Sequence, residues 1–194
     1  MKIIETKRLL LKEWQRRDAA RLYEYAKNPA VGWDAGWQPH ESPAMSRRII
    51  TKVFIPRGTW KIVRKKDGLA IGSIGLLPDD RRPSINSREL EYSLAQDCWG
   101  NGYMTEAAFA MLEYGFRVAK ADIISITTGT ENLRCQHVID KLHFVKEGLQ
   151  RKAYLMYDGS FRDLLCYSLT KEEWESHRWR QETGGYIKEY RAIW

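Results

Sequence analysis

A strand, a glycine turn and a long helix follow one another directly between residues 88 and 120, and this unit constrains the fold most. Apolar and polar residues alternate from Arg88 to Leu94, as in a half-buried strand. The turn Gly100-Asn101-Gly102 then leads into a helical pattern that starts at Met104. Open N–H groups of the turn and the positive end of the helix predict a seat for phosphate oxygens. Thr105 can add a hydroxyl there, although a glycine turn before a helix is often only a turn.

This glycine turn is neither of the two common nucleotide-binding fingerprints. A Rossmann fingerprint would need a third glycine and an acidic residue at the end of a second strand, and a P-loop would need Gly-Lys-Ser/Thr. The turn by itself therefore does not identify the ligand.

The rest of the hydrophobic pattern divides the chain into short strands and amphipathic helices. We expect strands at residues 8–14, 59–64, 69–76, 88–94, 123–128, 149–157 and 163–169. We expect helices at 18–28, at 42–53, after Gly102, at 131–142 and after Thr170, with residues 31–39 as a loop. This order predicts an α/β fold in which a mixed sheet carries helices on both faces. One domain is expected over residues 1–175, with a C-terminal extension at 176–194.

The net charge of +7 favours an anionic partner. CoA and nucleic acid both meet this condition. The Lys and Arg residues are scattered, without an arginine-rich tract or zinc-finger spacing, so a nucleic-acid partner is not expected and a basic nucleic-acid-binding module is kept only as an alternative. Dispersed basic charge is usually only a solvated surface.

The cysteine pattern bears on metal binding, and the first residues of the chain bear on its location in the cell. Cys98, Cys135 and Cys166 form neither a disulfide framework nor a zinc pattern, and we expect no bound metal. No apolar run approaches the ~20 residues of a membrane helix, and the first residues lack a signal-peptide pattern. We therefore expect a cytoplasmic protein with no membrane partner. The oligomeric state is left open, with a homodimer as one candidate.

Four separated motifs span nearly the whole chain, from about residue 3 to about residue 175. They are Glu5 to Leu11 with Asp18; Glu91 to Leu94 with Trp99 to Ala107; Asn132 to Cys135 with Lys141 to Phe144 and Glu147-Gly148; and Asp163 with Tyr167 to Leu169 and Trp174. In order and spacing they resemble the GNAT superfamily of N-acetyltransferases, and most of all its ribosomal-protein-alanine N-acetyltransferase branch. The resemblance implies the GNAT fold, with a mostly antiparallel central sheet. It also implies transfer of the acetyl group of acetyl-CoA to a primary amine.

The same resemblance implies a cofactor site. The backbone of Leu94, Ala95 and Gln96 would pair with the pantetheine arm of CoA, and the N–H of Leu94 would stabilise the oxyanion. The other implied cofactor-binding residues are Trp99, Gly100, Asn101, Gly102, Tyr103, Met104, Thr105 and Asn132. Met104 stands where a small residue is expected, so it either crowds the phosphate turn or packs in the core.

Two strand carboxylates and one thiol are candidates for proton transfer. A primary amine is largely protonated at neutral pH and needs a base, and Glu89 and Glu91 share the polar face of one strand. We choose Glu91, with two merely solvent-facing carboxylates as the alternative. By resemblance, Cys135 stands where the branch has a serine; it would protonate the CoA thiolate, or it is simply a buried apolar residue. The tyrosine that many GNAT enzymes use as acid falls at Ile139, which keeps a CoA-binding sensor with little turnover open.

The segment from Val31 to His40 is the acceptor wall that the resemblance implies. The candidate acceptor-binding residues are Trp33, Asp34, Trp37, His40 and Glu89. Aromatic faces attract cations, so this composition suits a pocket for an amine. The alternative is a loop held by tryptophan packing. The acceptor is either a protein N-terminus or a free small amine.

Overall fold

The computed structural model describes residues 3–176, and a sheet of eight strands forms its centre. The strands are β1 (Ile3–Glu5), β2 (Leu9–Glu13), β3 (Trp60–Arg64), β4 (Leu69–Pro78), β5 (Ser87–Leu94), β6 (Ile123–Gly129), β7 (Val145–Leu155) and β8 (Phe161–Thr170). Their order in the sheet is β1-β2-β3-β4-β5-β6-β8-β7. Only β5 and β6 pair in parallel, so the predicted mixed, mostly antiparallel sheet is confirmed.

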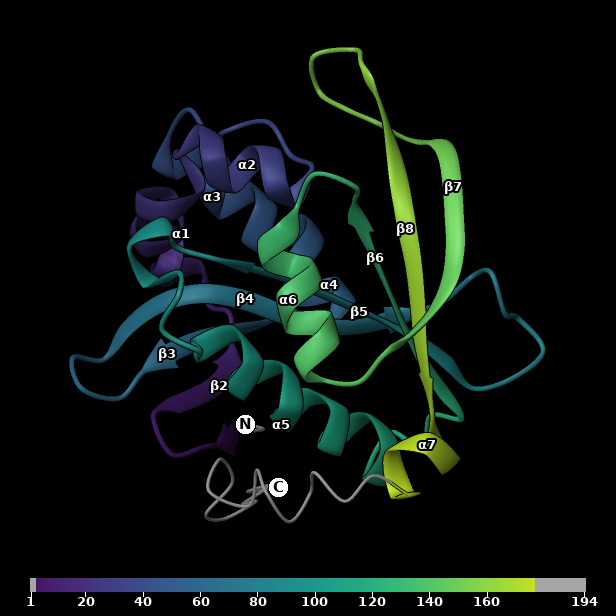
Figure 1. Cartoon of the computed structure of the whole chain (residues 1–194). Helices are drawn as coiled ribbons and strands as arrows, with labels where there is room; N and C mark the ends of the chain where they lie inside the picture. The colour runs from purple at the N-terminus through teal and green to yellow at the C-terminus, as the bar shows by residue number, and fades with distance from the viewer. Residues whose placement is uncertain (1–2, 177–194) are drawn as a thin grey trace.

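Helices cover both faces of this sheet, as predicted (Figure 1). They are α1 (Ala19–Ala26), α2 (Pro29–Ala35), α3 (Pro43–Ile49), α4 (Ile55–Arg57), α5 (Tyr103–Arg117), α6 (Leu133–Lys141) and α7 (Lys171–Ser176). On the α5 face, an added Cβ at Gly115 would meet Ile124 at 2.6 Å, so this glycine lets the helix lie close to β6. On the other face, Tyr25 of α1 hydrogen-bonds Ser73 of β4 at 2.7 Å. Apart from Ser176, the predicted C-terminal extension lies outside the described residues.

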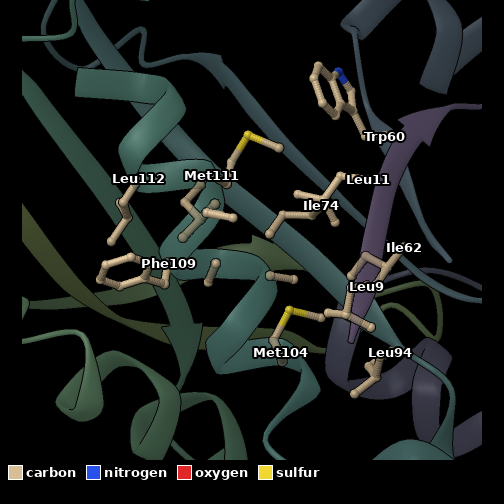
Figure 2. Packing of buried hydrophobic residues seen from close by; sticks show 14 of the residues in the cluster. Leu9, Leu11, Trp60, Ile62, Ile74, Leu94, Met104, Phe109, Met111 and Leu112 are labelled. Carbon is tan, nitrogen blue, oxygen red and sulfur yellow. The ribbon is translucent and has the colours of Figure 1, made fainter. Parts of the chain in front are cut away.

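The main core lies between α5 and the sheet (Figure 2). Leu90 and Leu94 are buried there, as the alternation of β5 predicts, although Ser93 on the opposite face is buried as well. Met104 is also buried and points toward Leu9 and Leu94 (Figure 2). Of the two roles left open for Met104, the structure supports packing in the core.

The predicted loop at residues 31–39 is wrong in its first half, because α2 occupies Pro29–Ala35. The side chain of Asn28 accepts a hydrogen bond from the N–H of Ala30, and proline stands at the first helical position. Gly36 ends the helix in the left-handed conformation at φ 78°. The Asn28-Pro29 pair thus ends one helix and starts the next, and only the ending was predicted.

The helix predicted at 42–53 begins as expected, with the Ser42 hydroxyl capping the N–H of Met45. It then changes to a π-helix at Ile50–Phe54 before the short α4. No sequence pattern predicted this change from α-helix to π-helix. The three-residue strand β1 was also missed, because so short an element shows no period of its own.

Candidate active site

A gap between β5 and β6 is the central feature of the site. The two strands pair only from Ser87 to Glu89 and from Ile123 to Ser125. Beyond these residues a cavity of about 590 Å³ is lined by residues 90–94 of β5 and 126–129 of β6. The start of α5, the helix α6 and the segment from α2 to α4 complete its wall. Strands that separate in this way leave backbone hydrogen-bonding groups free for an extended ligand.

The backbone of Leu94 faces this gap. Leu94 lies opposite Gly72 of β4, and the next N–H along β5, that of Ala95, donates to Ile71 O at 2.8 Å. Backbone groups of successive strand residues point to opposite sides, so the N–H and C=O of Leu94 point away from β4. Trp99 Nε1 donates to that carbonyl oxygen at 2.8 Å. The tryptophan of the glycine turn therefore fixes the residue whose N–H points into the gap.

The glycine turn lies at the start of α5. Gly100 and Gly102 have φ angles of 74° and 73°, a left-handed backbone that favours glycine. An added Cβ at Gly100 would meet nothing within 4 Å, and one at Gly102 would meet only Arg8 Nη2 at 3.5 Å. Thr105, in the first turn of α5, lines the same cavity. An open turn followed by a helix N-terminus suits phosphate oxygens.

Arg8 and Glu106 hold this turn, and the sequence reading gave neither a role. The carboxylate of Glu106 is fully buried and accepts hydrogen bonds from Thr6 Oγ1 at 2.6 Å, Arg8 N at 2.7 Å and Arg8 Nε at 2.6 Å. Arg8 Nη1 donates to Asn101 O at 2.9 Å, and the guanidinium lies 4.6 Å from the centre of the Tyr103 ring. An acidic residue in a first helical turn is a weak signal by itself. Its partner lies 98 residues away in the chain, which no local pattern shows.

Three predicted cofactor-binding residues do not reach the cavity. The N–H of Ala95 is bonded to β4, and Gln96 Oε1 accepts from Asn28 Nδ2 at 2.6 Å. The side chain of Asn101 donates to Trp99 O at 2.9 Å and so shapes the turn from within. Of the three residues expected to pair with the pantetheine arm, only the first offers its backbone to the gap.

The first turn of α6 closes the other side of the gap. Asn132 lines the cavity and also caps the helix, because its Oδ1 accepts from the N–H of Cys135 at 3.0 Å. Arg134 lies 4.1 Å from the centre of the Trp99 ring, and its Nη2 pairs with Asp34 Oδ2 at 2.7 Å. This arginine connects α6 to the glycine turn and to α2 across the cavity.

A thiol and a phenol meet inside the cavity. Tyr92 Oη lies 3.1 Å from Cys135 Sγ, and both residues line the cavity. Burial raises the pKa of the Cys135 thiol, and hydrogen bonds with Thr128 and Tyr92 oppose this rise. Burial also raises the pKa of Tyr92 well above its ordinary value, so both groups hold their protons at neutral pH. Ile139 is fully buried in the core.

The two strand carboxylates have different surroundings. Glu89 Oε1 accepts from Thr127 Oγ1 at 2.9 Å and pairs with Arg81 Nη2 at 3.2 Å. Glu91 has no such partner among residues 3–176. It reaches solvent, but the cavity walls remove much of its hydration, and this raises its pKa. The charge of Glu89 adds to the rise, and the charge of Arg57 opposes it.

The structure brings most of the predicted acceptor residues to the same cavity. Asp34, Trp37 and His40 line it, whereas Trp33 lies on the surface with 38% of its area exposed. His40 is buried and its Nδ1 lies 2.8 Å from Ser46 Oγ. Burial lowers the pKa of His40, so its ring is neutral at neutral pH.

Residues 8–145 match the family model described as an acetyltransferase (GNAT) domain. The chain belongs to the GNAT acetyltransferase family. The uncharacterized N-acetyltransferase p20 of Bacillus licheniformis is 28% identical over 180 residues, which cover 90% of this chain and 99% of p20. The [ribosomal protein uS5]-alanine N-acetyltransferase of Escherichia coli is 34% identical over 97 residues, half of each chain. The structure of spermidine N-acetyltransferase from Vibrio cholerae, in complex with CoA and spermine, has a TM-score of 0.73 at 18% identity and covers 87% of this chain and 99% of that one.

Family membership makes the chain an acetyl-CoA-dependent acyltransferase and confirms the expected fold. The matches give no support to the two alternatives, a CoA sensor and a nucleic-acid-binding module. In the part of the chain that the structure describes, no cluster of three or more metal-ligating side chains occurs. Within the same residues, no helix is long and apolar enough to cross a membrane.

Sequence reasoning missed one part of the cavity wall. Ile49, Val53, Phe54 and Arg57 of this GNAT enzyme line the cavity and come from α3, the π-helix and α4. π-helical turns often occur at functional sites, because the extra residue re-aims neighbouring side chains. The helical period of the segment gave no sign of the π-turn or of the face turned to the cavity.

Proposed function

We propose that this enzyme acetylates a primary amine in the cavity between β5 and β6, with Glu91 as the general base. One observation carries the proposal. The free N–H of Leu94 and the carboxylate of Glu91 lie three residues apart on β5, beside the same cavity. Among residues 3–176, Glu91 is the only carboxylate lining this cavity that makes no ion pair. A thioester and an amine held there would have a charge-stabilising donor and a proton acceptor close together.

The residues around the gap suit acetyl-CoA. The open glycine turn and Thr105 would hold the phosphates, and Asn132 would contact the arm from α6. The N–H of Leu94 would donate to the thioester oxygen as negative charge develops on it. A backbone donor aimed at such charge contributes about 3 kcal/mol to transition-state stabilisation.

Glu91 suits the role of base better than Glu89. The charge of Glu89 is already neutralised by Arg81, and its Oε1 is occupied by Thr127. The raised pKa of Glu91 brings its basicity closer to neutral pH, where a general base works best. A protonated amine entering the cavity would also gain a direct charge partner in Glu91.

Cys135 would return a proton to the departing CoA thiolate. Its thiol keeps its proton at neutral pH, since burial raises its pKa, and it lies beside the gap. The hydroxyl of Tyr92 would hold the sulfur in place and compensate part of the charge that forms on it. Tyr92 is thus a positioning residue. It does not take over the role of the family's acid tyrosine, whose position is occupied by the buried Ile139.

Both acceptor classes considered above stay open at the family level. One relative, that of Escherichia coli, acts on the alanine of a ribosomal protein, and one structural neighbour acts on spermidine. Trp37, Asp34 and His40 would form the acceptor wall in either case. The cytoplasmic location and the candidate homodimer stay predictions.

The test is a turnover assay with acetyl-CoA, an amine and peptide panel, and free thiol as the readout. Wild type should release thiol only when an acceptor is present. Glu91→Gln should lose most of this activity and Glu89→Gln much less, with acetyl-CoA affinity by calorimetry unchanged in both. If Glu89→Gln is the inactive variant, the assignment of the base is wrong. If no amine releases thiol from a protein that binds acetyl-CoA, the proposed transfer is wrong.

A further inference from the structure

The negative charges that line the cavity are nearly all used within the protein. Three carboxylates line it, those of Asp34, Glu89 and Glu91. Asp34 pairs with Arg134 at 2.7 Å, and Glu89 pairs with Arg81 at 3.2 Å. Within residues 3–176 this leaves the carboxylate of Glu91 alone to receive a cationic group of the acceptor.

Two of the four Lys and Arg side chains that line the cavity are also paired within the protein. Arg134 is neutralised by Asp34, and Arg162 pairs with Glu131 at 2.7 Å. Lys141 makes no ion pair with any described residue, but it ends α6, the helix that carries Cys135. Arg57 ends α4 on the acceptor side, is exposed, and makes no ion pair with any described residue. Arg57 and Glu91 line the same cavity, and the charge of Arg57 lowers the pKa of Glu91.

The surface beside this pair of charges is apolar. It is formed by Trp37, Ile49, Val53 and Phe54, which are half-buried and line the cavity. The last two belong to the π-helix. An uncharged side chain of the acceptor would be stabilised against this wall. A second ammonium group would instead meet apolar carbon and the like charge of Arg57.

We infer that the acceptor is a small zwitterion of the amino-acid type, with one ammonium for Glu91, one carboxylate for Arg57 and an apolar side chain. This inference rests on the proposed function and names the substrate class of the same site. The ammonium gives its proton to Glu91, and the neutral nitrogen then forms the amide bond as the thioester C–S bond breaks. The carboxylate stays bound to the guanidinium, and Cys135 protonates the thiolate. The second proton that the nitrogen loses as the amide forms restores the Cys135 thiol, and Glu91 releases the first proton to solvent. A polyamine lacks the carboxylate, and a peptide N-terminus carries an uncharged amide in its place.

Matched acceptors test each part of this zwitterion. Leucine, methionine and phenylalanine are compared with their amides and with their decarboxylated amines, next to spermidine and an alanine peptide. Rates are expressed per concentration of neutral amine, so that differences in amine pKa do not enter. Each amino acid should exceed its amide and its decarboxylated amine by about tenfold in kcat/KM, the size expected for a charge-assisted contact. Preference for spermidine or for the peptide would overturn the inference.

A pair of variants separates a carboxylate contact from a general effect of charge. Arg57→Gln should bring the ratio between amino acid and amide close to one, without changing the KM of acetyl-CoA. Lys52→Gln is the control, because Lys52 is exposed on the same helical segment and does not line the cavity. It should keep the wild-type ratio. An unchanged ratio in Arg57→Gln overturns the inference while leaving acetyl transfer intact. Absence of thiol release with every amine refutes the proposed function itself.

Discussion

Glu106→Gln tests whether the buried carboxylate beneath the glycine turn couples stability to cofactor binding. The carboxylate has no exposed surface and accepts three hydrogen bonds, from Thr6 Oγ1 and from the N and Nε of Arg8. Glutamine keeps one oxygen but replaces the other with an NH₂ group that faces donors. The substitution therefore removes the charge and sets donor against donor in a buried place.

The expected loss of stability follows from these contacts. Removing one partner of a buried ion pair costs about 3–5 kcal/mol. The Arg8 side chain is 39% exposed, so its guanidinium can regain water and the loss is smaller. We expect a decrease in the free energy of unfolding of about 2–3 kcal/mol, near the strength of one hydrogen bond to a charged group. For a chain of this size this corresponds to a Tm lower by roughly 4–12 °C.

The functional effect should appear in the KM of acetyl-CoA. Arg8 Nη1 holds Asn101 O at 2.9 Å, so freeing Arg8 loosens the glycine turn. We expect this KM to rise about fivefold, for the loss of about 1 kcal/mol of positioning, while kcat changes little. Thermal unfolding by circular dichroism and initial-rate kinetics measure both effects.

A control on the same helix separates the two effects. Glu113→Gln removes the carboxylate that pairs with Arg117 at 2.6 Å, far from the turn. It should lower the Tm without raising the KM of acetyl-CoA. If Glu106→Gln lowers the Tm but leaves this KM unchanged, Arg8 does not position the turn. If its Tm stays within a degree of wild type, the energetic reasoning itself is refuted.

Three further outcomes are expected. Glu91→Gln should lower kcat/KM by about 10²–10⁴, with partial recovery at high pH where more amine is neutral. Because desolvation raises the pKa of Glu91 in the folded protein, the ionised carboxylate destabilises the fold at pH 7. The variant should therefore have a higher Tm than wild type at pH 7 and lose this advantage near pH 4. Gly102→Val and Gly68→Val should both be destabilised by about 1–2 kcal/mol, because both glycines have positive φ, but only the former should weaken acetyl-CoA binding by calorimetry. Tyr92→Phe should lower kcat about threefold to tenfold in the presence of Cys135 and not at all in a Cys135→Ala background. It should also shift alkylation of the Cys135 thiol to higher pH, because the hydrogen bond that it removes lowers the pKa of that thiol. Equal losses of kcat in both backgrounds would show a merely structural tyrosine.

Much of the fold could be predicted from the sequence because its signals are local. The two-residue period of β5 by itself predicts that Leu90 and Leu94 are buried. The glycine turn before Tyr103 and the capping residue Ser42 each predict the start of a helix from a signal of at most four residues. The order of the elements and the helices on both faces of the sheet follow from such short-range rules. The family resemblance added Leu94, Asn132 and Cys135, and all three line one cavity.

Only the tertiary structure decided which of these groups act together. Glu89 and Glu91 are equivalent in the sequence, and they differ because Arg81 reaches one and not the other. The hydrogen bond between Tyr92 and Cys135 joins residues 43 positions apart, and it depends on how far β5 and β6 diverge. Ion pairs, strand separation and the π-helix are set by packing between distant segments. A periodic pattern states which face of an element is buried, but it does not state which element covers that face.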